Sequence, residues 1–380
     1  MKKIIACLLL LGSGFCIQAQ NKAQLTIKID QIISSDFPYV KAFTVVLNDK
    51  GEVVSGLAPG LFQFRVDSLE VSSKPKITPF SMQSMPIDYT IIFSNSGIME
   101  GEPLDFQKNA ILQLIETLKP EDRLSLYTIG EDASAIFEDK SKDSIDPALI
   151  NGVTVTSTQP RIYDSVINVI RKVQRKQIER KIVIIISDGR DQNSRFTKDQ
   201  LNAVVSEAGV PIYAIGLRVL TASSLSNLNE MSDLTGGSYT YAANAAAIPD
   251  SLRRLYARIT QAYIVDIRIN VIDADDMPHI LEIAVDERDA SGKGQKTFIA
   301  VKVPVPRWVK WAILIAAIVV IVLIILVWML HRLRKRRRMG ITRRRCPECR
   351  RRMKDSWDSC PFCKYLPEKR KKKKKRKKDA

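Results

Sequence analysis

Four cysteines near the C-terminal end carry the clearest chemistry in this sequence. They form two Cys-x-x-Cys pairs separated by ten residues, and they are Cys346, Cys349, Cys360 and Cys363. Two such pairs can place four thiolates tetrahedrally around one Zn²⁺, a common structural site. The spacing therefore predicts a short zinc ribbon over 343–366 that binds Zn²⁺ and leaves no open coordination position for catalysis. The alternative is a set of four reduced thiols without a metal.

The pairs resemble the short bacterial ribbon pattern in which Cys-Pro-x-Cys-Gly occurs twice. Arg350 and Lys364 stand where that pattern has glycine. We expect this departure to weaken the tight turn at each pair without removing a ligand. A unit this small buries little apolar surface, so zinc binding, worth about 10–16 kcal/mol, is expected to supply most of its folding energy.

An uncharged apolar run precedes the cysteines. Residues from Trp311 to Leu330 include no charged side chain, and twenty helical residues span about 30 Å, the thickness of a bilayer core. We therefore predict one transmembrane helix over 308–330. The segment 331–380 has 24 Lys and Arg against five Asp and Glu, a net charge of +19, which leaves −1 for the rest of the chain. By the positive-inside rule its C-terminal side is cytoplasmic.

The N-terminal residues are typical of a secretory signal peptide over 1–19. Two lysines precede the apolar stretch Ile4 to Leu11, and a cleavage site follows Ala19. A lipid anchor on Cys16 is the alternative, which the bulky Phe15 before it opposes. The sequence thus predicts a single-pass protein of the cell membrane (inner or plasma membrane) with residues 20 to about 307 outside the cytoplasm.

The tail over 367–380 includes ten consecutive basic residues, Lys369 to Lys378. Three interpretations remain open for it. It can bind the anionic inner leaflet, it can bind nucleic acid or a ribosome, or it can be a solvated tail. Tethering close to the membrane favours the lipid, and nucleic acid is the second choice because no aromatic residue interrupts the run.

Two stretches outside the cytoplasm have the alternation of β-strands, 20–80 and 264–305. Leu25, Ile27 and Ile29 alternate with polar residues in the first. In the second we expect Ser291 to Gly294 to form the turn between the last two strands. The two stretches either pair into one antiparallel unit (immunoglobulin-like or another sandwich), with the intervening domain inserted, or form separate small units.

Between them, residues 85–263 alternate short apolar strands with amphipathic helices. The strands include Asp88 to Phe93, Leu124 to Ile129, and the very apolar Lys181 to Ile186. Strands buried on both faces with helices between them are typical of a doubly wound, mostly parallel α/β sheet.

Several motifs in this stretch occur together in one family. They are Ile182-Val-Ile-Ile-Ile-Ser-Asp-Gly189, Gly209-Val-Pro-Ile-Tyr-Ala-Ile-Gly216 and Leu234-Thr-Gly-Gly-Ser-Tyr239. They resemble the later strands of a von Willebrand factor A (VWA) domain. The segments Gly51 to Leu57 and Phe62 to Phe64 are similar to the β domain that precedes many bacterial VWA modules.

The resemblance implies a cation site at the carboxyl ends of the strands, the metal-ion-dependent adhesion site (MIDAS). Its motif is Asp-x-Ser-x-Ser, a Thr from a second loop and an Asp from a third. The corresponding positions here are Ser94, Ser96, Ile98, Thr158 or Pro160, and Asp188. Hard dications need anionic oxygen ligands, and only Asp188 remains as a carboxylate. We therefore expect a degenerate site without Mg²⁺, in which Asp188 caps the next helix or hydrogen-bonds to Ser96.

No catalytic motif is visible, and the part outside the cytoplasm has one histidine, His279, beside a proline. We therefore expect no enzyme. The sequence favours a membrane-anchored interaction or adhesion module for a protein partner in the cell envelope, which the sequence does not identify. The alternative is a nucleic-acid- or ribosome-associated protein that acts through the ribbon and the basic tail.

Overall fold

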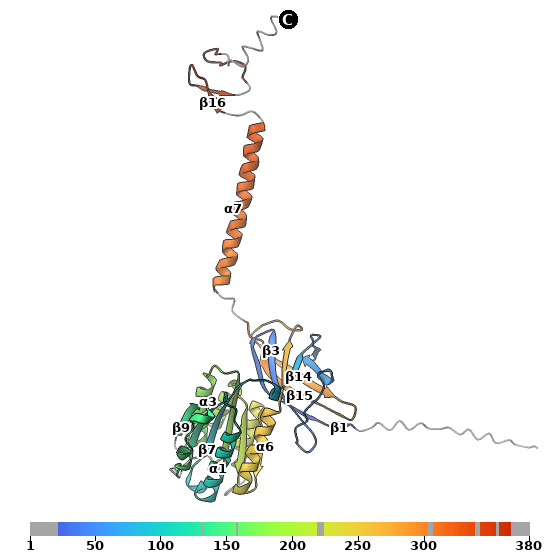
Figure 1. Ribbon diagram of the computed structural model, residues 1–380, viewed down its shortest axis with the longest axis vertical. Coiled ribbons are helices and arrows are strands. Elements are labelled where there is room, and N and C mark those ends of the chain that lie inside the picture. Colours follow the sequence, from blue (N-terminus) through green and yellow to red (C-terminus); the bar gives the residue numbers. More distant parts are fainter. Residues whose placement is uncertain are drawn as a thin grey trace, which may run out of the picture. The chain divides into compact units, whose positions relative to one another are not determined.

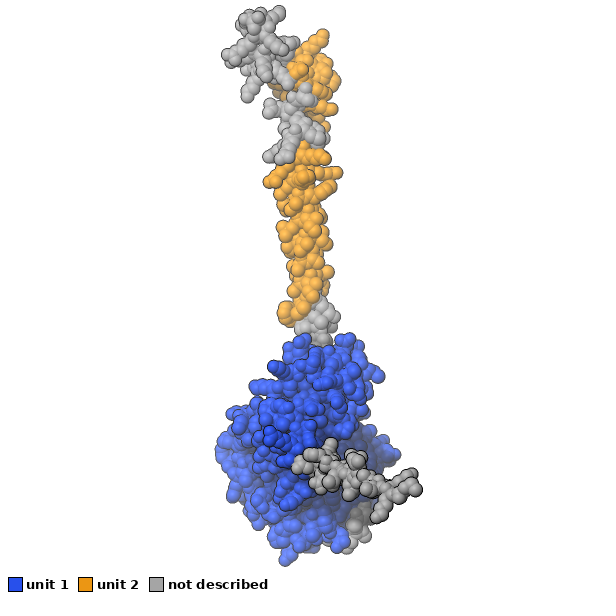
Figure 2. All heavy atoms as spheres, turned by 90° about the vertical axis from the view of Figure 1, so that its right-hand side faces the viewer, with its two compact units in different colours: residues 1–303 blue, residues 304–380 orange. Residues whose placement is uncertain are grey.

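The computed structural model describes residues 22–130, 132–156, 159–218, 224–302, 307–338, 343–354 and 357–365. They belong to two compact units, divided between Val303 and Pro304 (Figure 2). The expected signal peptide over 1–19 and the basic tail over 367–380 lie outside the described residues. We call the part up to Val303 unit 1 and the part from Pro304 unit 2.

A six-stranded sheet forms the centre of the inserted α/β domain in unit 1. Its order is β12-β11-β10-β7-β8-β9, with all neighbours parallel except β8 and β9. All residues of β7 and β11 are buried, because helices cover both faces of the sheet. The predicted doubly wound, mostly parallel fold is confirmed. The strands are β7 Ile87–Ser94, β8 Arg123–Ile129, β9 Ala133–Lys140, β10 Arg180–Ser187, β11 Ile212–Leu217 and β12 Tyr239–Ala242.

Helices pack on both faces of this sheet (Figure 1). The core on one face includes side chains of α1 (Glu102–Thr117) and α6 (Ile248–Thr260). The core on the other face includes side chains of α3 (Ile162–Gln174), α4 (Lys198–Glu207) and α5 (Leu225–Thr235), whereas the short α2 (Pro147–Asn151) adds only Ile150 to the first core. The start of α4 is fixed locally, because Thr197 and Gln200 form a capping box.

The β segments on either side of the α/β domain pair with each other. One sheet has the order β1-β15-β14-β4-β5 and the other β2-β3-β13-β6, so both segments contribute strands to each sheet. A separate apolar core fills the space between the two sheets. The strands are β1 Ala23–Gln24, β2 Thr26–Asp36, β3 Tyr39–Leu47, β4 Phe62–Val66, β5 Leu69–Glu70, β6 Lys76–Pro79, β13 Tyr263–Arg268, β14 Pro278–Asp286 and β15 Ala290–Ile299.

The expected turn at Ser291 to Gly294 is wrong. These residues lie inside β15, and the chain turns at 287–289, where Glu287 N donates to Ala290 O at 2.9 Å. The two glycines have another purpose: a Cβ on Gly292 would lie 2.0 Å from Leu25 O, and one on Gly294 would lie 2.1 Å from Ile27 O. Glycine lets β15 cross β2 closely and so closes one edge of the sandwich.

The sandwich and the α/β domain share a core as well. Phe43, Val45 and Leu47 of β3 point away from the other sheet of the sandwich and join the cluster that includes α1 and α6. Arg180 at the start of β10 and Tyr213 near the start of β11 both contact Asp30 of β2. The amino ends of these parallel strands therefore face the sandwich, and their carboxyl ends face away from it.

Unit 2 begins with one long helix, α7 (Arg307–Arg338). Its stretch Trp311–Lys335 is long and apolar enough to cross a membrane. After it, β16 (Arg343–Arg345) and β17 (Arg352–Lys354) form a short antiparallel hairpin beside the four cysteines.

Candidate functional site

The four cysteines of unit 2 lie together in the structure. Their Sγ atoms are all within 4.8 Å of one another; Cys346 and Cys363 are 3.4 Å apart, and Cys349 and Cys360 are 3.6 Å apart. Zinc–sulfur bonds of about 2.3 Å in a tetrahedron place sulfurs about 3.8 Å apart. The arrangement and the all-sulfur donor set therefore fit a Zn²⁺ ion, and four protein ligands would close its coordination shell.

Two tight turns hold the cysteine pairs. Arg350 N donates to Cys346 O and Lys364 N donates to Cys360 O, both at 2.8 Å. Arg350 (φ 56°) and Lys364 (φ 58°) adopt the left-handed backbone that glycine has in the bacterial pattern. The replacement of glycine thus leaves the turns formed and costs about 1–2 kcal/mol of backbone strain at each position.

Aromatic rings and cations meet on the surface of the ribbon. Phe362 is 56% exposed, and the Arg351 guanidinium lies 4.8 Å from its ring centre. The ammonium group of Lys354 lies 5.9 Å from the ring centre of the half-buried Trp357. The ribbon therefore presents aromatic faces together with positive charge.

The expected MIDAS position lies at the carboxyl end of β7. Ser94 and Ser96 are buried, and their Oγ atoms are 3.2 Å apart. Asn95 between them donates to Thr156 Oγ1 at 2.9 Å, a contact that the sequence did not indicate. Ile98 packs against the core instead of offering a hydroxyl ligand. Thr158 lies outside the described residues.

Asp188 is paired with a neighbouring cation. Arg190 Nε donates to one carboxylate oxygen of Asp188, and Arg190 N donates to the other at 3.4 Å. Asp188 forms no helix cap and no hydrogen bond to Ser96, so both expected roles are wrong. The Arg190 guanidinium already compensates the charge of the Asp188 carboxylate, and the other positions of the MIDAS motif supply no carboxylate. These residues do not fit a hard dication such as Mg²⁺.

The loop that carries Asp188 supports the start of α5. Ser224 Oγ donates to Asp188 O at 2.8 Å, and Asn227 Nδ2 donates to Gly189 O at 3.1 Å. Gly189 has φ 72°, and a Cβ there would lie 2.3 Å from Ser224 O. This close approach requires glycine and fixes the position of α5 at the carboxyl edge of the sheet.

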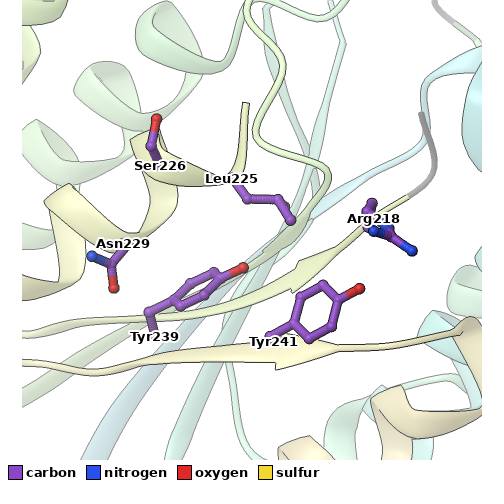
Figure 3. A pocket seen from close by; sticks show the side chains of 6 residues that line it. All are labelled: Arg218, Leu225, Ser226, Asn229, Tyr239 and Tyr241. Atoms are coloured by element: carbon purple, nitrogen blue, oxygen red, sulfur yellow. The ribbon is translucent and has the colours of Figure 1, made fainter. Parts of the chain in front are cut away.

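Helix α5 also lines a hollow of about 480 Å³ at this edge of the sheet (Figure 3). Arg218 follows β11, and the two tyrosines belong to the edge strand β12. Arg218 forms no ion pair with any residue that the structure describes. Burial raises the pKa of Tyr239, so its hydroxyl remains a hydrogen-bond donor at neutral pH. The lining residues are Arg218, Leu225, Ser226, Asn229, Tyr239 and Tyr241.

Sequence reasoning missed Arg190 and this hollow. Arg190 was visible as a cation two residues after Asp188, a spacing at which a side chain can fold back onto a carboxylate. Arg218 gave no such signal, because only the pairing of β11 with β12 brings it near Tyr241.

Comparisons with known proteins identify the α/β domain. The model of the von Willebrand factor type A domain family matches residues 88–254. An uncharacterized protein of Synechocystis sp., sll0103, is 22% identical over 188 residues, which cover 46% of this chain and 42% of that protein. The chain thus spans less than half the length of this curated relative.

The chain is also similar to proteins with solved structures. A von Willebrand factor type A protein from Catenulispora acidiphila is 10% identical, with a TM-score of 0.42 over 73% of this chain and 74% of its own. The hypothetical protein BatB from Bacteroides thetaiotaomicron is 13% identical, with a TM-score of 0.38 over 46% of this chain and 98% of its own.

Proposed function

Because residues 88–254 are a von Willebrand factor type A domain, we propose that this chain is a membrane-anchored protein that presents that domain outside the cytoplasm for binding to a protein partner. The signal peptide over 1–19 directs unit 1 across the membrane, and α7 anchors it in the cell membrane with the C-terminal residues inside. The domain acts as an interaction module, and no enzymatic reaction is assigned to it.

The observation that carries the proposal is the direction in which the domain faces within unit 1. The amino ends of β10 and β11 contact the sandwich through Arg180 and Tyr213. Strands of six to eight residues are about 20–26 Å long, so the loops at the carboxyl ends lie that far from the sandwich. Ligands of open α/β sheets bind at this end. The polypeptide that leads to α7 leaves from the sandwich, so the loop end is free for a partner.

The hollow beside α5 is the contact position that the geometry favours. Arg and Tyr are the residue types enriched at the energetic centres of protein interfaces. Arg218, which has no ion pair among the described residues, attracts an acidic group. With the cation site degenerate, Arg218 and the two tyrosine hydroxyls supply the polar recognition groups. We assign Ser94, Ser96 and Asp188 to the support of the neighbouring loops.

The cytoplasmic part is proposed to be a structural zinc ribbon followed by a lipid-binding tail. Cys346, Cys349, Cys360 and Cys363 hold Zn²⁺, which supplies folding energy and no catalysis. The basic residues 369–378 attract anionic lipids of the inner leaflet, each worth up to about 1 kcal/mol near the surface.

A second function class, nucleic-acid binding by the ribbon, is favoured by one specific contact. The exposed Phe362 with Arg351 over its ring offers a stacking surface next to positive charge, the combination that binds single-stranded nucleic acid. Phe362→Ala should then weaken binding of a single-stranded oligonucleotide by about tenfold, whereas a purely electrostatic tail would bind it unchanged.

The main proposal is tested in two steps on the full chain. Protease added to spheroplasts should digest the VWA domain and spare an epitope placed after Ala380, and digestion of that epitope would contradict the assigned orientation. Cross-linking in the native envelope should then capture a partner that is lost with Arg218→Ala and with Tyr241→Ala. The matched control is Arg175→Ala, which removes an exposed arginine just after α3. Equal capture by all variants would exclude the hollow as the contact.

A further inference from the structure

Exposed apolar side chains of unit 1 gather at one end of the sandwich. Among its described residues nine large apolar side chains are exposed, and five of these lie at this end. We call this surface the exit end and define it by Tyr39, Leu69, Met277, Ile280 and Ile299. The remaining four, Met82, Leu149, Leu234 and Tyr241, belong to other parts of unit 1.

Hydrogen bonds hold the turns of the exit end together. Ser34 Oγ donates to Ile299 O at 2.7 Å, and Ala300 N donates to Met277 O at 3.2 Å. In the sheets Pro278 pairs with Ile299, and Arg268 pairs with Tyr39.

The β4–β5 turn belongs to the same end. Ile280 N donates to Asp67 Oδ1 at 2.9 Å, and Leu69 follows that turn at the start of β5. The five apolar side chains thus sit on loops and strand ends that are fixed to one another.

The exit end is opposite the attachment of the VWA domain. The chain enters that domain after Pro79 of β6 and returns from it at Tyr263 of β13. Strand β13 then runs to Arg268, beside Tyr39, about 17 Å away along the strand. The apolar side chains are therefore on the side of the sandwich that is remote from the loop end of the VWA sheet.

The chain leaves unit 1 at this same end. Strand β15 finishes at Ile299, and the apolar stretch of α7 begins at Trp311. The eleven residues between them span at most about 36–40 Å when fully extended. An α7 that crosses the bilayer therefore keeps the exit end close to the membrane surface.

We propose that the exit end rests on the extracytoplasmic surface of the bilayer, with Met277, Ile280 and Ile299 in the headgroup layer. This inference rests on the membrane anchorage proposed above. Contact with lipid removes apolar surface from water at the place where the tether already holds it. The consequence is a fixed orientation in which the loop end of the VWA domain faces away from the membrane.

The charges of the exit end select the lipid. Asp67 accepts a hydrogen bond from Ile280 N, and Asp275 accepts one from Met277 N. Asp276 pairs with Lys302, and Arg268 lies opposite Tyr39. His279 contacts two of the carboxylates. Acidic side chains are repelled by anionic headgroups, so the surface fits zwitterionic lipid and should bind it better than anionic lipid.

Residues 22–302 provide the test, since the three apolar cores of unit 1 are formed by its own residues. All four tryptophans of the chain lie beyond residue 303, so Ile280→Trp introduces a single probe. A C-terminal histidine tag attaches this protein to phosphatidylcholine vesicles that include a nickel-chelating lipid. The tag replaces α7, so this experiment does not depend on whether α7 crosses the membrane. A negative result here is therefore distinct from a negative result of the protease assay on spheroplasts.

Brominated phosphatidylcholine should quench the Ile280→Trp fluorescence at least threefold more than that of a Leu149→Trp control on α2. Adding Met277→Ser and Ile299→Ser should reduce this difference in quenching between the two positions. Vesicles that include anionic phosphatidylglycerol should reduce it too. Equal quenching at both positions, or none at either, would overturn the proposal. A blue shift of the Ile280→Trp emission that depends on protein concentration and not on lipid would also overturn the proposal. It would indicate contact between copies of the chain instead.

Discussion

Arg180 and Asp30, 150 residues apart in the chain, form an ion pair between the VWA sheet and the sandwich. Arg180 Nη2 lies 3.4 Å from Asp30 Oδ2, and neither side chain is accessible to solvent. Tyr213 donates to the same carboxylate oxygen at 2.5 Å, and burial keeps the Tyr213 hydroxyl protonated by raising its pKa well above the usual value. The guanidinium also lies over the Phe43 ring at 4.2 Å. The two parts of unit 1 are therefore joined by a specific polar contact.

Breaking this pair on one side should be costly. Arg180→Met leaves the Asp30 carboxylate buried without its cation, so the free energy of unfolding of residues 22–302 should fall by about 3–5 kcal/mol. The double change Arg180→Met with Asp30→Leu should cost less than the sum of the single changes. Urea unfolding measures both effects. Arg253→Ala, in an exposed pair with Asp250, should leave stability nearly unchanged, and an equally small effect of Arg180→Met would contradict the assigned role.

Divalent cations should leave unit 1 unaffected. Arg190 occupies the Asp188 carboxylate, so titration with Mg²⁺, Mn²⁺ or Ca²⁺ should not shift the melting temperature, whereas a specific ligand would raise it by mass action. Differential scanning calorimetry is the measurement. A saturable rise that is abolished by Asp188→Ala, with Asp199→Ala as the control at an exposed position, would show that the site still binds a cation.

Metal removal should unfold the ribbon. A peptide of residues 340–368 should bind one Zn²⁺ and lose its structure when a chelator is added, because so few residues cannot offset their conformational entropy without the metal. Co²⁺ should give the absorption of a tetrahedral four-sulfur site, and Cys349→Ser should weaken it at least tenfold while Ser359→Ala leaves it unchanged. A peptide that stays folded with a chelator present would falsify the site.

His279 should make the stability of unit 1 dependent on pH. Hydrogen bonds to Asp67 and Asp275 raise the pKa of His279 above the ordinary histidine value of about 6.5. A raised folded-state pKa gives stability that is fully present below about pH 6.5 and is lost as the pH rises through the folded-state value. Urea midpoints from pH 5.5 to 8.5 should therefore decline, and His279→Gln should flatten this decline. His279 is the only histidine before residue 303, so an unchanged slope in the variant would contradict the assignment.

The same contacts lower the pKa of Asp67 and Asp275. Their contribution has the opposite sign with pH, since it is present above about pH 4 and is lost as the pH falls through the lowered folded-state values. Asp67→Asn should therefore reduce stability most at pH 5–6, where the carboxylate and the imidazolium are both charged.

The local patterns of the sequence were sufficient for the fold class and for the grouping of the four cysteines. Runs such as Lys181 to Ile186 indicate strands buried on both faces because covering helices exclude water from every side chain. Cysteine spacing indicates a metal site because two cysteines with two residues between them can share one turn and point their thiolates at one ion. The sequence also showed that Ser94 stands where the MIDAS motif has Asp. The type of a ligand residue can be read from the sequence without knowing how the chain packs.

The sequence did not determine which residues meet across long separations. The role of the Gly292–Gly294 segment depends on how closely β15 approaches β2, a distance that no local pattern encodes. The Arg180–Asp30 pair and the apolar exit end each bring together residues from strands far apart in the chain, and the hollow around Arg218 depends on the pairing of β11 with β12. By itself the sequence determined the α/β class, the long apolar helix and the cysteine cluster, because local periodicity and cysteine spacing are properties of neighbouring residues. Only the tertiary structure decided the sandwich pairing and the partners of Arg180, because burial and charge compensation at these places depend on contacts that form when distant strands pack.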